Sequence, residues 1–431
     1  MHRSESPKHG LIVLFVFIAA MPVRLWFSVG PFKTCTILDI AVWLSAAGVL
    51  VFSRFQHLKV GHRLLFIALC TPVVVAVLSL IWSEHLLSTV KIVIYYTTAI
   101  FTYLVAVNLF RRCSPRFIVG CVAIFVMTTL LFAIIYWFRV PFALSLAEIS
   151  IGQLESLDEY TYAVAFARLN HPYLGLSNDF ATTLVLYVFF FIGVAQATWQ
   201  RRYIAVAGAS ALGVLLTLSR GIVLVMVGVV GVALMLRFSV RTFVVTVMMI
   251  GLLIIPVYLF TEQVRQSGID ILGVRVMDYG DIYARFDRFS SALRMIEQSP
   301  LLGYGGGGYM GKDVDAIDSA FHNTYLEQWA DYGIVFGSLV VLALLSLPWS
   351  LFRWAKRGGE VKTVARFTGF AIIAYLLVCA VETSNEAVMS RLMFYLFLGW
   401  AVAYLNALQR ERMLSEERHN FHEPNVGYHH C

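Results

Sequence analysis

The feature that most constrains this sequence is a succession of long apolar runs separated by short polar connections. A helix needs about 20 apolar residues to cross the roughly 30 Å of hydrocarbon in a bilayer. Hydrophobic residues make up 59% of the 431 residues and charged residues only 14%. So little charge cannot cover a water-soluble surface. The pattern therefore predicts an all-α, polytopic integral membrane protein.

About twelve runs are long enough to be membrane spans when judged by that length. We expect a break at Ser219-Arg220-Gly221, because one helix over Ile204–Leu236 would be about 50 Å long at about 1.5 Å per residue. In chain order the predicted spans are Gly10–Val29, Thr36–Phe52, Leu64–Trp82, Ile92–Phe110, Phe117–Phe138, Phe180–Thr198, Ile204–Leu218, Ile222–Leu236, Phe243–Phe260, Gly333–Phe352, Phe367–Val381 and Val388–Leu408.

Short clusters of Lys and Arg fix the expected orientation. Each cluster follows an even-numbered span, so we expect these connections and both termini to be cytoplasmic. Residues 1–410 then form a single transmembrane domain with two long periplasmic connections, 139–179 and 261–332, and residues 411–431 form a polar cytoplasmic tail. The net charge is +7, but most Lys and Arg residues lie in these short clusters and not along one face. This distribution argues against a nucleic-acid partner.

The second long connection carries the strongest candidates for chemistry. At about 100° per residue, Ile282, Phe286, Phe289, Leu293 and Ile296 form one apolar stripe of a helix. On the same helix, Arg285 flanks this stripe at about 60° from its centre, whereas Arg288 and Arg294 lie about 120° away. Arg285 is therefore the arginine expected to face a crevice, and a solvated helix face is the alternative.

A glycine run and a histidine follow this arginine helix. The run Gly303-Tyr304-Gly305 and the glycines after it could turn backbone N–H groups around an anion, or form a plain flexible loop. His322-Asn323 then opens the helix that leads into the next span. An imidazole that titrates near neutral pH suits proton abstraction, so His322 is a candidate general base.

Two further arginines fall on the predicted outer side, where arginine is disfavoured. Arg220 sits at the boundary between two spans, as a functional cation or as a snorkelling anchor. Arg168 precedes the sixth span and fits either a phosphate contact or a loop contact. The six cysteines lack metal-ligand spacing, so we expect no disulfide framework and no zinc site. We also expect no other metal and no cofactor.

These patterns resemble the O-antigen ligase family, which shares a domain with O-antigen polymerases. Ser219-Arg220-Gly221 is similar to its serine-arginine pair, the stretch from Arg285 to Gly305 to its arginine helix followed by Pro-Leu-x-Gly-x-Gly, and Phe321-His322-Asn323 to its His-Asn motif. Phe289 stands where the family often has tryptophan. The resemblance implies a GT-C-like membrane glycosyltransferase of the bacterial inner membrane, with a periplasmic active site.

The resemblance also implies the reaction and the residues that perform it. A glycan would pass from undecaprenyl diphosphate to the lipid A core, without a metal and with inversion. His322, Arg285 and Arg220 would be catalytic, with membrane lipids around them. Substrate contacts would come from Arg168, Arg288, Gly303, Gly305 and Asn323.

Two rival functions remain open at this point. An O-antigen or exopolysaccharide polymerase would use the same donor with a second lipid-linked glycan as acceptor. A transporter or flippase would move substrate without making bonds, and it would place charged or broken spans near the midplane of the bilayer. The candidate arginines and His322 gather at one boundary instead, which favours group transfer.

Overall fold

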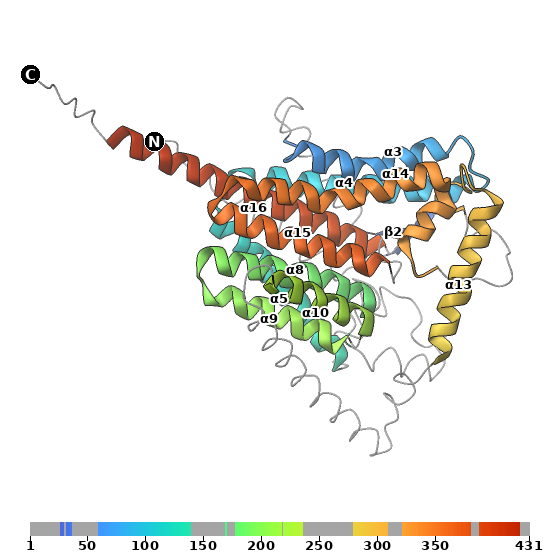
Figure 1. The fold of residues 1–431 in the computed structure, drawn as a ribbon, viewed down its shortest axis with the longest axis horizontal. Helices are drawn as coiled ribbons and strands as arrows, with labels where there is room; N and C mark the ends of the chain where they lie inside the picture. The colour runs from blue at the N-terminus through green and yellow to red at the C-terminus, as the bar shows by residue number, and fades with distance from the viewer. Residues whose placement is uncertain are drawn as a thin grey trace, which may run out of the picture.

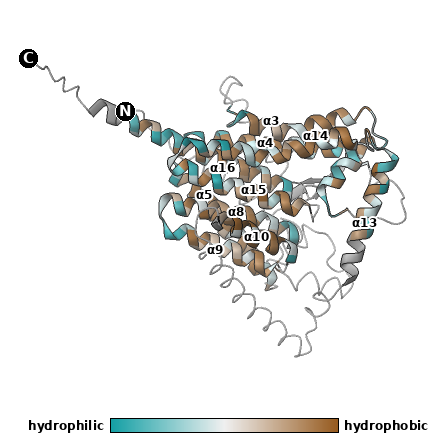
Figure 2. Ribbon diagram, viewed as in Figure 1, coloured by the Kyte–Doolittle hydropathy of each residue, from teal (hydrophilic) through white to brown (hydrophobic). Residues whose placement is uncertain are grey.

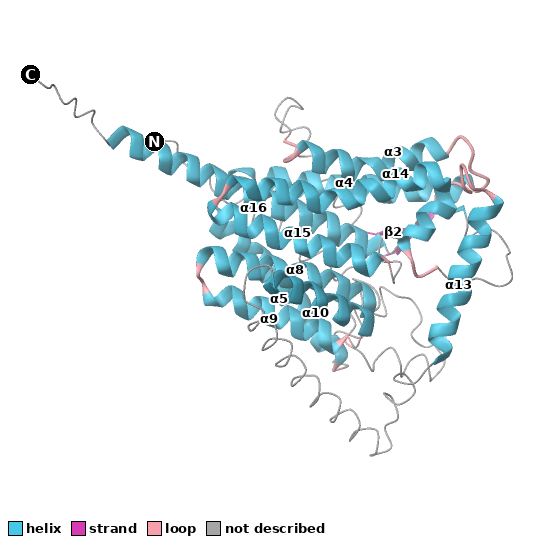
Figure 3. Cartoon of the chain, viewed as in Figure 1, coloured by secondary structure: helices cyan, strands magenta, loops and turns pink. Residues whose placement is uncertain are grey.

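The computed structural model describes residues 26–29, 32–36, 59–138, 169, 177–217, 219–235, 279–308, 321–380 and 388–422. Helices form nearly all of this part of the chain (Figure 3). The predicted span Phe243–Phe260 lies outside it, as does most of the first two predicted spans.

The described helices follow the predicted apolar runs. α13 is the predicted arginine helix and the others coincide with predicted spans. In chain order they are α3 (Arg63–Ser79), α4 (Leu86–Leu109), α5 (Pro115–Trp137), α8 (Ser177–Thr198), α9 (Arg201–Leu216), α10 (Arg220–Met235), α13 (Tyr279–Gln298), α14 (Thr324–Trp354), α15 (Gly359–Cys379) and α16 (Val388–His422), with the 3-10 turns η1 (Phe110–Arg112) and η4 (Ala355–Arg357).

Within the described residues, six helices are long and apolar enough to cross a membrane. They are Leu86–Arg112, Pro115–Trp137, Ser177–Thr198, Thr324–Arg357, Gly359–Cys379 and Ser390–Glu417. Arg63–Ser79 and Arg220–Ala233 are shorter apolar helices. Figure 2 shows apolar residues along the bundled helices and hydrophilic residues concentrated toward the ends.

One hairpin departs from the predicted helices. β1 (Trp26–Val29) pairs antiparallel with β2 (Phe32–Thr36). The prediction that Gly10–Val29 is helical throughout is therefore wrong for its last four residues. The physical reason is local: a Gly30-Pro31 pair favours reversal of the chain, and the flanking aromatic and β-branched residues favour strands.

α15 is the central helix, packing against α8, α10, α14 and α16. Small residues let these helices approach closely. A β-carbon added at Gly193 of α8 would lie 2.7 Å from the Phe367 side chain of α15. One added at Gly399 of α16 would lie 2.6 Å from Ala106 of α4. Such close backbone contacts are a main source of stability between helices in lipid.

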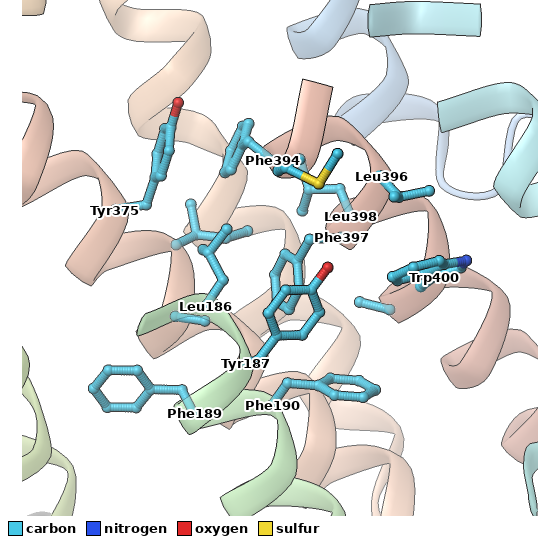
Figure 4. Close-up of a cluster of buried hydrophobic side chains, with 14 of the residues drawn as sticks. Leu186, Tyr187, Phe189, Phe190, Tyr375, Phe394, Leu396, Phe397, Leu398 and Trp400 are labelled. Atoms are coloured by element: carbon cyan, nitrogen blue, oxygen red, sulfur yellow. The ribbon is translucent and has the colours of Figure 1, made fainter. Parts of the chain in front are cut away.

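An aromatic core joins α5, α8 and α16, and Figure 4 shows its side chains from α8 and α16. The Tyr187 and Phe397 rings meet edge to face with centroids 5.5 Å apart, and the Phe125 and Trp400 rings do so at 4.9 Å. Edge-to-face pairs of this kind add roughly 0.5–1.5 kcal/mol each beyond the burial of their area. The core therefore fixes how α16 sits against α5 and α8.

The helices give the bundle two distinct ends. We call the end where α14 begins the His322 end, because His322 directly precedes α14. α8 runs antiparallel to α15, since Gly193 lies beside Phe367, so α8 begins at this end. Ser219 of the α9–α10 junction bonds to Asn178 of α8, which places the start of α10 there too.

The opposite end, called the His62 end, is rich in arginine. Arg410 of α16 donates hydrogen bonds to the carbonyls of Arg111 and Cys113, and Arg412 donates to the Arg357 carbonyl at 2.7 Å. α16 continues without interruption to His422, past the predicted domain boundary at residue 410. In Figure 1 this part of α16 projects beyond the bundle.

His62 itself is held between aromatic and cationic groups. Its ring stacks on Trp354 with centroids 5.3 Å apart. Burial lowers the pKa of the His62 imidazole, and the charges of Arg357 and Arg353 lower it further. His62 is therefore packed as the neutral base.

This arrangement predicts that the protein loses stability as the pH falls. Because the folded-state pKa of His62 is lowered, the contribution of the neutral ring is present above the unfolded value of about 6.5 and is lost as the pH falls toward the folded value. The melting temperature in detergent should drop on acidification below about pH 6.5. A His62→Phe variant, which keeps a ring against Trp354, should have a shallower pH dependence. An unchanged slope in this variant would refute the assignment.

Candidate functional site

The turn before α14 is fixed by Asn323. The Asn323 side chain accepts hydrogen bonds from the backbone N–H groups of Tyr325 at 2.9 Å and Leu326 at 3.0 Å, so it is the N-cap of α14. Its amide nitrogen donates to the carbonyl of Ala380, just after α15, at 2.9 Å. The prediction that His322-Asn323 opens this helix is confirmed, and the cap ties α14 to α15.

His322 has an unusual backbone conformation. Its φ is +54°, in the left-handed region, and its side chain is half-buried. A residue with a β-carbon typically costs about 1–2 kcal/mol in this conformation. Strained residues of this kind cluster at functional sites, where the surrounding structure holds them in place. Here the adjacent Asn323 cap and the buried Phe321 hold the turn.

α14 is interrupted at Gly333, where φ is +68° and ψ is 174°. The interruption frees backbone groups that a continuous helix would pair. The carbonyls of Ala330 and Asp331 instead accept from the N–H groups of Tyr304 at 3.1 Å and Gly305 at 2.7 Å. The N–H of Ile334 donates to the Pro300 carbonyl at 2.7 Å. Residues 300–305 thus provide the hydrogen-bond partners on both sides of the interruption.

The glycine run is also bonded to the turn between α3 and α4. The Gly306 N–H donates to the Ser79 hydroxyl at 3.3 Å, and the Thr89 hydroxyl donates to the Gly306 carbonyl at 3.0 Å. Trp82 donates from its indole nitrogen to the Leu302 carbonyl at 2.7 Å. The run therefore joins α13, α14 and the α3–α4 turn.

Gly303 and Gly305 have a structural reason to be glycine. Both have positive φ, and a β-carbon at either would come within 2.5 Å of Ala330 and Asp331 or of Ser83. The N–H groups of Tyr304, Gly305, Gly306 and Gly308 donate within the protein. The run is closely packed and hydrogen-bonded at these positions, an outcome that neither sequence-based alternative described, and a substrate contact at Gly303 or Gly305 stays a prediction.

The buried face of α13 differs from the predicted apolar stripe. Two members of the stripe, Phe286 and Leu293, are 63% and 51% exposed, whereas a third, Ile296, is buried together with Ala292 and Met295 from outside the stripe. The buried face is turned by roughly 100° from the predicted one, at about 100° per residue. The stripe prediction is wrong for Phe286 and Leu293, because α13 packs on α14 through small and flexible side chains. Arg288 is half-buried as a result, and Arg294 is exposed.

Arg220 is the first residue of α10 and its side chain is exposed. The predicted break is confirmed, since α9 ends at Leu216 and α10 begins at Arg220. The buried Ser219 hydroxyl donates to Asn178 at the start of α8, at 2.7 Å. Arginine at a helix N-terminus adds positive charge to the positive end of the helix dipole. That combination suits an anionic ligand.

The structure gives only partial positions for two of the predicted site arginines, Arg168 and Arg285. Arg168 lies outside the described residues, but the N–H of the adjacent Leu169 donates to the Leu216 carbonyl at the end of α9, at 3.0 Å. Arg285 belongs to α13, and its side chain lies outside the described part. The structure therefore brings Arg220, His322 and the neighbour of Arg168 to one end of the bundle. Their convergence with Arg285 in one pocket stays a prediction.

The sequence reasoning missed three enclosed charged residues at the His322 end. Arg391 in the first turn of α16 is 1% exposed, Glu327 of α14 is 0% exposed and Asp331 is 2% exposed. Arg391 could have been found, because it interrupts the predicted apolar span Val388–Leu408 and charge inside a span is costly. Glu327 and Asp331 carry no such signal in the sequence, because they lie before the predicted span that begins at Gly333.

Several helices are apolar and long enough to cross a membrane, and a polar site lies at one end of the bundle. These are the features of a multi-pass membrane protein. Residues 204–342 match the family model of the O-Antigen ligase. The match runs from α9 into α14 and includes Arg220, Arg285 and His322, so the resemblance predicted from the motifs is confirmed. A search of curated proteins gave no match.

The interruption of α14 can be tested with a pair of glycine variants. Gly333→Ala should destabilise the protein by about 2 kcal/mol or more, because its backbone strain alone costs roughly 1–3 kcal/mol and its β-carbon would overlap Leu301. Gly208→Ala is the matched control: Gly208 lies in α9 with open space around it, so alanine should be neutral or stabilising. Thermal unfolding in detergent measures both, and equal melting temperatures would contradict the packing role.

Proposed function

We propose that this protein is an O-antigen ligase that transfers a glycan from undecaprenyl diphosphate to the lipid A core. The observation that carries the proposal is His322, half-buried and in a left-handed turn, at the same end of the bundle as Arg220. The family match over residues 204–342 supports glycosyl-transfer chemistry on a lipid-linked glycan, by a ligase or a polymerase.

In the proposed reaction the donor loses its diphosphate as the acceptor attacks. His322 takes the proton from a sugar hydroxyl of the acceptor, and that oxygen forms a bond to the anomeric carbon. The bond between this carbon and the diphosphate oxygen breaks, and the electron pair leaves with the undecaprenyl diphosphate. Attack from the face opposite the leaving group inverts the anomeric centre.

The leaving group gathers negative charge, which arginines can stabilise by charge-assisted hydrogen bonds without a metal ion. Arg220 and Arg285 are proposed to bind the diphosphate, with Arg168 and Arg288 as further contacts. The exposed guanidinium of Arg220 and the N–H groups at the start of α10 support this role. Asn323 holds the histidine turn in place through its bonds to α14 and Ala380.

We assign the His322 end to the periplasm and the His62 end to the cytoplasm of a bacterial inner membrane. The support is charge: most of the described basic residues lie at the His62 end, as expected for short cytoplasmic connections. They include Lys59, Arg63, Arg111, Arg112, Arg116, Arg201, Arg202, Arg353, Lys356, Arg357, Lys362, Arg366, Arg410 and Arg412. Both termini are then cytoplasmic, and the single transmembrane domain ends near residue 410.

The general base is tested by His322→Ala in a purified system with a defined lipid-linked glycan and lipid A core. Transfer should fall by about 10²–10⁴-fold, the usual contribution of a positioned base, while donor binding and the melting temperature change little. Arg294→Ala is the control and should keep wild-type transfer, because Arg294 is an exposed arginine of α13 that donates a hydrogen bond to Ser291 of the same helix. Wild-type turnover in the His322 variant would rule out this base.

Arg220→Lys tests recognition of the diphosphate. Lysine keeps the charge but cannot offer two parallel N–H groups, so kcat/KM should fall by at least about tenfold. Offering the same enzyme a second lipid-linked glycan as acceptor separates the two transfer reactions. Products on the lipid A core support a ligase, and lengthened lipid-linked glycan supports a polymerase. Turnover in detergent, without a gradient, excludes transport as the sole activity.

A further inference from the structure

Arg391 is an enclosed cation among membrane-spanning helices. Its side chain is 1% exposed, and its guanidinium carbon lies 4.0 Å from the ring centroid of Tyr96 on α4. A desolvated cation–π contact of this kind is favourable. Even so, an apolar side chain of similar volume commonly gives equal or greater stability at such positions. Stability alone therefore does not explain why this position is an arginine. A charge inside a membrane span is costly and points to a functional role.

The part of α16 that carries Arg391 also packs on α15. Tyr375 of α15 stacks on Phe394, one turn along α16 from Arg391, with ring centroids 4.0 Å apart and planes 10° apart (Figure 4). These contacts fix the last turn of α15 against the first turn of α16.

The last turn of α15 also supports the backbone turn at His322, just before α14. The Tyr325 hydroxyl donates to the Leu376 carbonyl at 2.6 Å, and the Asn323 amide donates to the Ala380 carbonyl at 2.9 Å. A series of contacts therefore runs from the first turn of α16, which carries Arg391, through α15 to the residue next to His322.

The packed ends of α14, α15 and α16 also enclose an acidic residue. Glu327, in the first turns of α14, is 0% exposed. Charges so enclosed act over longer distances than charges in water. Replacing Arg391 by an uncharged residue would remove the positive charge from these packed helix ends, so we expect a small shift in the first turns of α14.

We propose that Arg391 is a positioning residue for the transfer reaction, which holds the end of α15 beneath α14 and thereby aims His322 at the acceptor hydroxyl. The inference rests on the proposed function. A displacement of about 1 Å at a reacting group can cost about 10²-fold in rate. Loss of Arg391 should therefore act on turnover, whereas the diphosphate contacts of the donor come from other residues.

The test compares kcat, donor KM and melting temperature among variants of the full-length protein. Arg391→Met should lower kcat by about 10–100-fold and leave the donor KM within about threefold. Arg391→Lys should recover only part of kcat, since lysine lacks the planar guanidinium that stacks on Tyr96. Tyr96→Phe keeps the ring, so its kcat should stay near that of wild type. Tyr96→Leu removes the ring, so its kcat should be lowered about as much as that of Arg391→Lys.

Arg410→Met is the matched control. Arg410 is on the same helix but at the His62 end, where it bonds the carbonyls of Arg111 and Cys113. Its loss should lower the melting temperature and leave kcat unchanged. A kcat in folded Arg391→Met equal to that of wild type would overturn the proposal, and so would a raised donor KM at unchanged kcat. If Arg391→Met does not fold, the kcat of Tyr96→Leu decides in the same way.

The positioning role and the proposed function fail in different ways. Full activity in His322→Ala would remove the proposed base, whatever Arg391 does. An inactive His322→Ala beside a fully active Arg391→Met would remove only the positioning role.

Discussion

A helix inside a membrane satisfies its own backbone hydrogen bonds, so any interruption must find replacement partners. At Gly333 the partners come from residues 300–305, whose N–H and carbonyl groups exchange bonds with both sides of the interruption in α14. Other hydrogen bonds, between Leu302 or Gly306 and Trp82, Ser79 and Thr89, hold this run on the α3–α4 turn. The interruption leaves the first turns of α14 as a separate short helix, which carries Glu327 and is capped by Asn323, next to His322. The candidate site is built around this segment.

Much of the helical architecture was predictable because membrane spans obey a simple length rule. The helices from α3 to α16 lie on predicted apolar runs, and the break at Ser219-Arg220 could be predicted because a single helix would exceed the bilayer. The hairpin at Trp26–Val29 was missed because an apolar run alone does not distinguish strand from helix. The interruption at Gly333 was predicted only as the start of a span.

The site was predictable where its residues form local patterns. His322-Asn323 and Arg220 were recognisable from their neighbours in the sequence. The buried face of α13 was not, because it depends on which side of that helix meets α14, and Ala292 and Met295 form the contact in place of the larger Phe286. Arg391 and Glu327 become neighbours of the site only through the packing of α14, α15 and α16, which no sequence spacing encodes.

The length of α16 also has a practical consequence. One uninterrupted helix of 35 residues begins beside the histidine turn and continues past the far end of the bundle to His422. At about 1.5 Å per residue it separates its two ends by roughly 50 Å. A reporter protein or affinity handle fused after His422 would therefore sit a full bundle length from the reacting groups. Purification and imaging can use that terminus without blocking the approach of large lipid-linked substrates.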